Sequence, residues 1–313
     1  MVKKVSLAMP VYNGEKYIAS AIESILAQDY PNIELIITDN CSEDRTAEIC
    51  KEFAARDDRV RYVRNPRNLG AAPNYNRGFE LATGEYLKWC AHDDKISPNY
   101  VSACVAALEA DPEASLAFGS TICIDLEGNE FEGMDSDETP AILNDDASER
   151  YYRAITLGGT CFPIFGVFRM DMLKRSTLHR SYYGSDRALI AEAALLGKVL
   201  RVEEAVFYNR EHPSRSIRMV DHAERSKWQD TSSTSRTASM EHVSLARHLF
   251  EIASRHGDTV PPMAARRAVL RFVATPLRAG RLVLDVVRYF SPGLARQLRR
   301  VGPLFQRRSV DAS

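Results

Sequence analysis

The chain has 313 residues, of which 45% are hydrophobic and 27% are charged. This composition is typical of a globular protein with one large domain and a smaller appendage, and it argues against a chain that is disordered throughout. We expect neither a signal peptide nor a membrane-spanning helix, because no apolar run approaches the ~20 residues that span a bilayer. The six cysteines form no Cys-x-x-Cys pair, so we expect a cytoplasmic protein without zinc or disulfides.

The net charge of −1 hides an uneven distribution along the chain. Residues 259–313 contain eleven arginines, no lysine or glutamate, and two aspartates, so this segment carries +9 and the rest of the chain carries −10. A basic segment of this kind suggests a binding partner of its own.

The basic segment has three candidate partners: a membrane surface, protein or nucleic acid. Residues 261–308 are predicted to contact a membrane surface, with arginines at the lipid headgroups and apolar side chains against the lipid. These apolar side chains are Val269, Leu270, Phe272, Val273, Leu282, Val283, Val286 and Val287. Alternatively, the segment packs on the rest of the chain or on a second copy. No nucleic acid is expected, because aromatic residues are sparse among the arginines and the rest of the chain is acidic.

Strands and helices alternate over the first hundred residues. Apolar runs at residues 5–9, 33–38, 60–63 and 86–90 predict strands. Helices are predicted between them, around Ile18–Leu26, around Ile49–Phe53 after a cap at Ser42 or Asp44, and from Pro73 to Ala82. This alternation predicts an α/β fold with a mostly parallel sheet and helices on both faces. Ligands bind outside the carboxyl ends of the strands in such sheets, so the residues that follow each strand are the first candidates for a site.

The rest of the chain is less regular. We predict a helix at 100–109, a strand at 116–124, a turn at 127–129, an acidic loop at 131–148, an apolar stretch at 158–169, a helix at 186–196, short strands at 199–207, and helices at 241–256 and 261–308. The last helix is broken at Pro276 and Pro292. A polar, Ser/Thr-rich stretch precedes these helices. We therefore predict a first domain over residues 1–220, a linker over 221–240 and a helical, arginine-rich segment over 241–313.

Polar or turn-forming residues follow each of the first four strands, at Pro10–Asn13, Asp39–Ser42, Asn65–Gly70 and His92–Asp94. The backbone of the first set can wrap a nucleobase, with Tyr12 packed beside it. Asp39 can accept hydrogen bonds from a base or a ribose, and Gly70 lets backbone approach a ligand closely because it lacks Cβ. Each set also has a purely structural interpretation as a strand-to-helix turn, a cap or an Asx-turn.

The acidic pair Asp93–Asp94 carries the most weight. Transfer of a sugar from a nucleotide diphosphate requires the departing pyrophosphate to be neutralised, and a divalent ion held by carboxylates does this without proton transfer. Adjacent carboxylates on an extended backbone point in different directions, so we expect one to face the metal and the other to face the ribose or the loop. The alternative is a solvated acidic turn.

Together, these four sets resemble the family 2 glycosyltransferases over residues 3–215. The resemblance lies in Pro10-Val-Tyr-Asn-Gly-Glu-Lys-Tyr-Ile, in Asp39 with Ser42, Asp44 and Thr46, in Asn65-x-x-Asn68-Leu-Gly70, and in Gly84-Glu-Tyr followed by His92-Asp-Asp94. It implies a GT-A fold, a UDP-, GDP- or dTDP-sugar donor, Mn²⁺ or Mg²⁺, and a hexosyl transfer that inverts the anomeric carbon. The expected acceptor is a glycan or a lipid-linked molecule of cell-surface polysaccharide or glycolipid synthesis, which places the enzyme in the cytoplasm, peripheral to the membrane.

The resemblance also implies roles for individual residues. Asp39 contacts the base or the ribose, Asp93 lies near the ribose, and Asp94 is the metal ligand. His92 stands where the family often has its first acidic residue, which leaves the partner of Asp94 open. The complete nucleotide-sugar-binding set that we expect is Pro10, Tyr12, Asn13, Glu15, Asp39, Asn68, Gly70, Asp93 and Arg210.

An inverting transfer needs a base that takes the proton of the acceptor hydroxyl. In the family this is an acidic residue about a hundred positions after the metal motif, and Asp186 in Tyr183-Gly-Ser-Asp-Arg fits. The start of a helix favours the ionised carboxylate that a base requires. The alternative is that Asp186 only caps its helix, and Glu192 is a weaker candidate for the base.

The stretch Arg210-Glu-His212-Pro-Ser-Arg215 is the last candidate site. His212 is predicted to complete the metal shell or touch the pyrophosphate, and Arg210 or Arg215 to neutralise phosphate charge. A plain surface loop is the alternative. The acidic run Asp135–Glu138 is interpreted as a solvated loop.

Other protein classes fit less well. The loop after the first strand is not the Gly-rich, Arg-containing loop of a sugar-phosphate nucleotidyltransferase, and it lacks the Gly-x-Gly-x-x-Gly of a dinucleotide-binding dehydrogenase. The alternative from a different class is a non-catalytic nucleotide-sugar-binding or scaffold protein on a decayed transferase fold.

Overall fold

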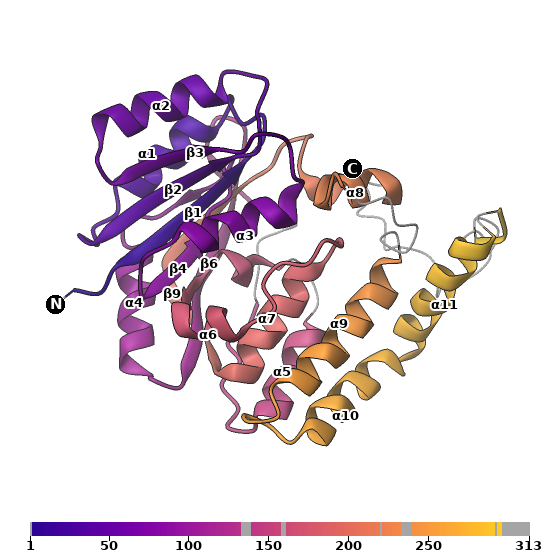
Figure 1. Ribbon diagram of the computed structural model, residues 1–313. Coiled ribbons are helices and arrows are strands. Elements are labelled where there is room, and N and C mark those ends of the chain that lie inside the picture. The colour runs from indigo at the N-terminus through magenta and orange to yellow at the C-terminus, as the bar shows by residue number, and fades with distance from the viewer. Residues whose placement is uncertain are drawn as a thin grey trace.

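The computed structural model describes residues 2–132, 139–157, 161–219, 221–232, 240–291 and 293–295 (Figure 1). Two features predicted from the sequence lie outside the described residues. They are the acidic run Asp135–Glu138 and residues 296–308 of the basic segment.

One half of the central sheet is parallel. The strands β3 (Val60–Arg64), β2 (Ile33–Asp39), β1 (Val5–Val11) and β4 (Tyr86–Trp89) lie side by side in this order, all pointing the same way. All seven residues of β1 are buried, as expected for a strand that has neighbours on both edges and helices on both faces. The four predicted strands are therefore confirmed, and their carboxyl ends share one edge of the sheet.

The other half of the sheet is mixed. It continues from β4 through β8 (Val167–Arg169), β6 (Ala114–Ile124), β9 (Lys198–Arg210) and β5 (Lys95–Ile96), and β7 (Glu130–Phe131) pairs with β6. Strand β6 is parallel to β9, whereas β8 runs antiparallel to both β4 and β6. The short strands predicted at 199–207 form one strand of 13 residues. Its far end pairs with β5, directly after the acidic pair.

Helices cover both faces of the sheet (Figure 1). One apolar core lies under α1 (Ile18–Leu26), α2 (Thr46–Arg56) and α4 (Tyr100–Ala110), where Ile18, Ile22 and Ile25 of α1 follow the spacing of a single helix face. The other core lies under α3 (Ala71–Leu81), α5 (Ala147–Thr156), α6 (Met170–Arg175) and α7 (Ser185–Leu196). Two short 3₁₀ turns complete these connections, at Phe162–Phe165 and Ser216–Arg218.

The C-terminal helices share the second of these cores. Helix α9 (Glu241–Arg255) packs on α7, and α10 (Pro262–Val273) packs on α5 and α9. Val269 and Phe272 are buried in the core with residues of α5 and α7. This corrects the expectation that these two side chains face lipid. Leu270 and Val283 are exposed, the latter on α11 (Pro276–Phe290). None of the described helices is both long and apolar enough to cross a membrane.

The predicted linker contains a packed helix. Helix α8 spans His222–Gln229, and its Arg225 and Gln229 are buried. Asp221 caps this helix by accepting hydrogen bonds from the backbone N–H groups of Ala223 and Glu224. The buried residues of α8 are themselves polar, so composition alone does not reveal that this part of the predicted linker is packed. The division of the chain into domains stays a prediction.

A buried polar network joins α9 to the segment before α7. Glu192 is fully buried, and its carboxylate lies 2.7 Å from His256 and accepts a 2.6 Å hydrogen bond from Thr177. The Thr177 hydroxyl in turn lies 2.8 Å from His248, whose other ring nitrogen lies 2.9 Å from the Tyr182 hydroxyl. Glu192 therefore supports the fold and is closed to an acceptor, which removes it as a candidate base.

His248 should make the folded protein sensitive to acid. Burial lowers the pKa of His248 from 6.5 to about 4. Between these values the unfolded chain binds a proton that the folded protein does not, so the free energy of unfolding falls as the pH drops from 6.5 to 4, by roughly 2 kcal/mol between pH 7 and pH 5. Urea denaturation at these two pH values should show the loss. In His248→Gln, the free energy of unfolding should differ less between pH 7 and pH 5 than it does in the wild type. An unchanged difference would show that His248 is not the origin of the acid sensitivity.

Candidate active site at the carboxyl edge of the sheet

The loops after β1 and β2 are bound to each other. Asn13 has a positive φ of 52°, and its side-chain oxygen accepts a 2.9 Å hydrogen bond from the backbone N–H of Glu43. The Glu15 carboxylate accepts another, of 3.0 Å, from the backbone N–H of Arg45. Pro10 lies within β1, buried opposite Thr38. Tyr12, Asn13 and Glu15 are exposed, and Tyr12 is the one of these that offers an aromatic ring, 41% accessible.

Asp39 is completely buried at the end of β2. One carboxylate oxygen accepts a 2.8 Å hydrogen bond from the backbone N–H of Ser42, and the other accepts one of 2.6 Å from the Tyr62 hydroxyl. The Arg64 guanidinium lies 3.5 Å away. Burial and this hydrogen bond raise the pKa of Tyr62. The tyrosine therefore stays protonated, and its hydroxyl donates a hydrogen bond to Asp39. The turn interpretation of Asp39 thus holds, and a contact with a base remains a prediction.

The loop that contains Asn68 and Gly70 is packed against helix α8. The Asn68 side-chain oxygen accepts hydrogen bonds from Asn40 and from the Gly70 backbone, and the Thr231 hydroxyl donates a 2.6 Å hydrogen bond to the Asn68 carbonyl. A Cβ atom added to Gly70 would lie 2.5 Å from the Asp230 Cα. We predicted that Gly70 lets backbone approach a ligand. The structure corrects this, because the closely approaching backbone is the end of α8.

The acidic pair is fixed by the end of β9. Because β5 pairs with residues 207–208 of β9, the residues just beyond reach back to the pair. Asp94 accepts a 2.7 Å hydrogen bond through Oδ1 from the backbone N–H of Arg210. Asp93 Oδ2 lies 2.8 Å from His212 Nε2. The two carboxylates thus have different partners, in agreement with the prediction that adjacent side chains diverge.

The two carboxyl groups of the pair differ in their electrostatics. Burial alone would raise the pKa of Asp93, but the positive charge of His92 and the hydrogen bond with His212 outweigh it and lower this pKa. Burial and the negative charge of Asp93 raise the pKa of Asp94 well above its usual range, against a partial offset from the Arg210 backbone. Asp94 is therefore the group that a nearby cation would stabilise most.

Arg210 has a structural position that the sequence did not predict. Its side chain is buried, and it donates hydrogen bonds of 2.9–3.0 Å to the backbone carbonyls of Asp93, Asp125 and Leu126. The guanidinium also lies over the Tyr17 ring, 5.0 Å from its centre. This corrects the expectation of a phosphate contact, because the donors of Arg210 already hold the loop of the acidic pair.

The metal prediction fits Asp94 better than His212. His212 Nε2 is engaged by Asp93, and the ring packs 5.1 Å from that of Tyr17. Within the described residues, no three His, Cys, Asp or Glu side chains gather into a metal site. Asp94 is therefore the carboxylate that fits a divalent ion whose remaining ligands are water and substrate phosphate, as Mg²⁺ commonly has. The role of His212 as a second metal ligand stays a prediction.

Asp186 lies in the first turn of α7, where the N-cap residue is Gly184. Its carboxylate is 41% exposed and lies 3.4 Å from His179 Nδ1. Burial raises the pKa of Tyr75, and the negative charges of Asp186, Asp93 and Asp94 raise it further. Tyr75 is thus within electrostatic reach of all three carboxylates.

The model of the family described as Glycosyl transferase family 2 matches residues 6–176, more than half of the chain. The chain belongs to this family. The resemblance noted from the four strand-end motifs is thereby confirmed.

Curated relatives of this family 2 chain come from several bacteria. Glycosyltransferase GlyG of Streptococcus pneumoniae is 34% identical over 120 residues, which cover 38% of this chain and 40% of that protein. The putative glycosyltransferase EpsE of Bacillus subtilis is 41% identical over 107 residues, 34% of this chain and 38% of the relative. The GalNAc(5)-diNAcBac-PP-undecaprenol beta-1,3-glucosyltransferase of Campylobacter jejuni is 27% identical over 191 residues, 59% and 58% of the two chains. The matches thus span about 40% to 60% of these relatives.

Two solved structures confirm the GT-A fold of the family 2 chain. Residues 1–349 of S. aureus TarS in complex with UDP-GlcNAc match with a TM-score of 0.63 at 15% identity, over 91% of this chain and 80% of the other. The mannosyltransferase PcManGT from Pyrobaculum calidifontis, in complex with GDP-Man and Mn²⁺, matches with a TM-score of 0.54 at 15% identity, over 94% and 88% of the two chains. Identities this low establish the fold alone.

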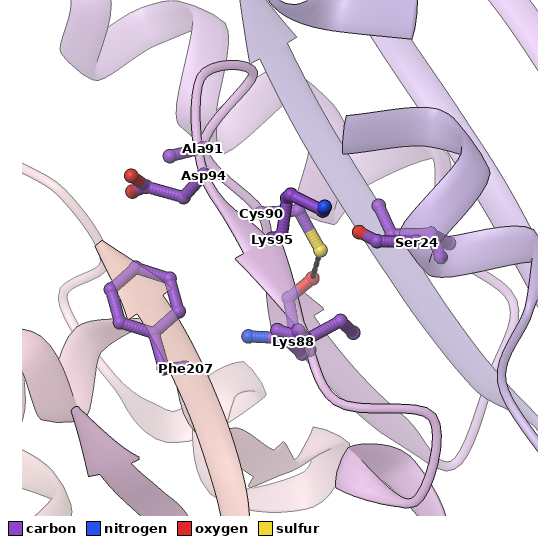
Figure 2. A pocket seen from close by; sticks show the side chains of 9 residues that line it. Ser24, Lys88, Cys90, Ala91, Asp94, Lys95 and Phe207 are labelled. Atoms are coloured by element: carbon purple, nitrogen blue, oxygen red, sulfur yellow. Dashed lines mark hydrogen bonds between the residues drawn. The ribbon is translucent and has the colours of Figure 1, made fainter. Parts of the chain in front are cut away.

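A buried lysine lies below the acidic pair of the family 2 chain. Figure 2 shows a small pocket with Asp94 at one side and Lys88 at its floor, between β4, β5, α1 and β9. The Lys88 ammonium donates a hydrogen bond to the Phe165 carbonyl and lies 4.4 Å from the centre of the Tyr100 ring. Burial lowers the pKa of Lys88, whereas Asp94 works against this shift. Lys88 lies within the apolar run that predicts the strand Tyr86–Trp89. A lysine in such a run was the sequence signal for a buried ammonium group near Asp94, and the sequence analysis did not predict it.

Gly70→Ala should destabilise the protein more than Gly184→Ala. Both glycines have a φ near +90°, where an L-residue costs roughly 1–2 kcal/mol. A Cβ at Gly70 would also collide with the Asp230 backbone, whereas a Cβ at Gly184 meets no atom within 4 Å. We expect roughly 3 kcal/mol or more of lost unfolding free energy for Gly70→Ala and less than 2 for Gly184→Ala. Equal losses in chemical denaturation would show that α8 does not press on this loop.

Proposed function

We propose that this chain is an inverting glycosyltransferase that moves a hexosyl group from a nucleotide-diphosphate sugar to a hydroxyl of a glycan or lipid-linked acceptor. Membership of glycosyltransferase family 2 supports the reaction class. The observation that carries the proposal is the acidic pair at the carboxyl edge of the sheet, where Asp93 lies 2.8 Å from His212 and where burial and the charge of Asp93 raise the pKa of Asp94. A divalent ion that accompanies a nucleotide diphosphate would offset this repulsion.

Asp94 would hold the metal, Mn²⁺ or Mg²⁺, together with oxygens of the donor pyrophosphate. The mannosyltransferase PcManGT was solved with Mn²⁺, which supports the use of a divalent ion here. Such an ion neutralises the charge that develops on the leaving nucleotide diphosphate. The Arg210 backbone N–H holds one Asp94 oxygen in place, so the orientation of the carboxylate toward the donor is set before the donor binds.

The nucleotide would bind over the loops after β1, β2 and β4. Tyr12 would offer its exposed ring to the base, and Asp93, which lies 2.8 Å from His212, would face the ribose. Asp39, which would contact the base or the ribose, is held in place by Ser42 and Tyr62. The remaining residues predicted to bind the nucleotide sugar would act by shaping these loops. They are Pro10, Asn13, Glu15, Asn68 and Gly70. The solved neighbours carry UDP-GlcNAc and GDP-Man, so UDP and GDP donors are tested first.

Asp186 would act as the base. Its ionised carboxylate takes the proton of the acceptor hydroxyl while that oxygen attacks the anomeric carbon from the face opposite the nucleotide diphosphate, which leaves with the electron pair of the broken bond. Configuration at this carbon is thereby inverted. Asp186 lies in the N-terminal turn of α7, and His179 lies beside the carboxylate, packed between the rings of Tyr75 and Trp89.

A lipid-linked acceptor would place the protein on a membrane. The Campylobacter jejuni relative is named for an undecaprenol-linked acceptor, which supports this acceptor class. Residues 259–313 carry a charge of +9, which an anionic membrane surface attracts. We therefore propose a cytoplasmic protein, peripheral to the membrane, that acts in polysaccharide or glycolipid synthesis.

The proposal is tested by donor binding, measured as a thermal shift with Mn²⁺ across UDP-, GDP- and dTDP-sugars. A bound donor stabilises the native state by ~2.7 kcal/mol at a hundredfold excess over its Kd, so at least one sugar should raise the melting temperature by several degrees. Absence of any shift, together with absence of sugar-nucleotide hydrolysis, would overturn the proposal.

Asp94→Ala should abolish turnover and the Mn²⁺-dependent part of the donor shift, because the metal loses its protein ligand. Asp58→Ala is the matched control, since this exposed aspartate precedes β3 at the opposite edge of the sheet. Turnover is measured as release of nucleotide diphosphate. If Asp94→Ala kept full cellular function without turnover, the non-catalytic alternative would hold.

Asp186→Asn should leave donor binding intact while lowering the rate of transfer by about a hundredfold or more, the typical contribution of a general base. The carboxylate is part-exposed, so its amide should fit without loss of fold. Donor affinity by thermal shift and transfer rate with excess donor separate the two effects. Transfer at the wild-type rate would refute the role of Asp186.

A further inference from the structure

His179 is a buried histidine beside the carboxylate of Asp186. Its side chain is 4% exposed, and its Nδ1 lies 3.4 Å from Asp186 Oδ1, whereas the Asp186 side chain is 41% exposed. The two partners therefore differ in their freedom to move. The imidazole is enclosed by protein and the carboxylate borders solvent, so a contact between them restrains the carboxylate rather than the ring.

Aromatic rings and a side-chain amide fix the imidazole in place. The centre of the His179 ring lies 4.9 Å from that of Tyr75 and 4.8 Å from that of Trp89, whose plane is nearly perpendicular to it at 83°. The Asn76 amide donates a 2.9 Å hydrogen bond to the His179 carbonyl and accepts one of 3.1 Å from the His179 backbone N–H. Tyr75 and Asn76 belong to α3, and Trp89 ends the strand β4 that leads into the acidic pair. The parallel half of the sheet thus holds a ring that faces α7.

Two unfavourable features accompany the placement of this ring. Leu178, immediately before it, has a positive φ of 53°, a left-handed conformation that costs free energy in a residue with a Cβ atom. His179 Nε2 is buried, and no hydrogen bond to it comes from the part of the chain that the structure describes. Buried polar atoms without a partner are uncommon in native proteins. An apolar ring would fill the same space without an unpaired nitrogen, so packing alone does not explain a histidine here.

The contact with Asp186 assigns the hydrogen of the neutral ring. An ionised carboxylate only accepts hydrogen bonds, so the neutral imidazole facing it carries its hydrogen on Nδ1 and a lone pair on Nε2. A shift of a few tenths of an ångström by the part-exposed carboxylate brings the 3.4 Å separation into the ordinary range of a hydrogen bond. Distances of this kind commonly shorten once a substrate is bound.

We propose that His179 is a positioning residue for the base. Its Nδ1–H holds Oδ1 of Asp186, so that the other carboxylate oxygen points toward the acceptor hydroxyl. This proposal rests on the proposed function, in which Asp186 takes the acceptor proton. His179 neither gains nor loses a proton in that step: the proton passes from the hydroxyl to Asp186, the hydroxyl oxygen bonds to the anomeric carbon, and the bond to the nucleotide diphosphate breaks.

The test compares the transfer rates of His179→Phe and His179→Asn. Phenylalanine keeps a planar ring between Tyr75 and Trp89 but offers no donor, so kcat should fall about tenfold, with the KM for the donor and the donor-induced thermal shift unchanged. The asparagine amide offers a donor close to the position of Nδ1 and should restore kcat to within about threefold of the wild type. His179→Gln extends its amide toward the position of Nε2, so it should lose activity as the phenylalanine variant does.

His242 provides a matched control. Its Nδ1 also lies 3.4 Å from a carboxylate oxygen, Oδ2 of Asp285, in a contact between α9 and α11 that includes no residue of the proposed site. His242→Phe should therefore transfer sugar at the wild-type rate. Melting temperatures measured without donor check that each variant is folded.

A double-mutant cycle distinguishes positioning of the base from support of the fold. In the Asp186→Asn background the base is absent, so adding His179→Phe should lower the residual transfer rate by less than about twofold. A histidine that only supports the fold would lower the rate by the same factor in both backgrounds.

Three results would overturn the positioning role. They are transfer by His179→Phe at the wild-type rate, an equal loss of kcat in His179→Phe and His179→Asn, and an equal effect of His179→Phe with and without Asp186. Failure of the proposed base has a different signature, because Asp186→Asn itself would then transfer at the wild-type rate. If Asp186→Asn is inactive and His179→Phe is fully active, the base stands and the role of His179 falls.

Discussion

The return of β9 to the acidic pair is the contact on which the site depends. A single arginine, Arg210, holds Asp94 through its backbone N–H and the Asp93 carbonyl through its side chain, across more than a hundred residues of sequence. Its buried guanidinium donates hydrogen bonds to backbone carbonyls that would otherwise be unsatisfied in the protein interior. The mixed half of the sheet thereby fixes the loop that ends the parallel half.

This arrangement gives two neighbouring aspartates different chemistry. Asp93 lies beside His92 and His212, whereas Asp94 faces the negative charge of Asp93, which the Arg210 backbone N–H and the charges of Arg215 and Arg210 offset only in part. A pair with equal surroundings would share one proton or one ion between its members. Under the proposed function, this asymmetry favours a cation at Asp94 over one at Asp93.

The sequence predicted the strand ends better than it predicted the surroundings of each residue there. Apolar runs located the parallel strands, and a parallel sheet brings strand ends together whatever the loops contain. Gly70 shows why the roles of single residues were harder to predict. A glycine that packs against a ligand and a glycine that packs against α8 cannot be distinguished in a single sequence. Phe272 is buried and Arg210 points into the protein because of contacts with segments a hundred or more residues away. Local sequence patterns carry no information on such contacts.

Helix α8 has a consequence for how small an active piece of this protein can be. Its end packs on the backbone at Gly70, and Arg225 lies 4.5 Å from the centre of the Tyr183 ring, three residues before Asp186. One short helix thus contacts both the loop at Gly70 and the segment that precedes α7. A chain cut at residue 220 would keep every predicted site residue and lose these contacts, along with the cover that α9 and α10 give to the core. The unit that folds is larger than the unit that carries the motifs.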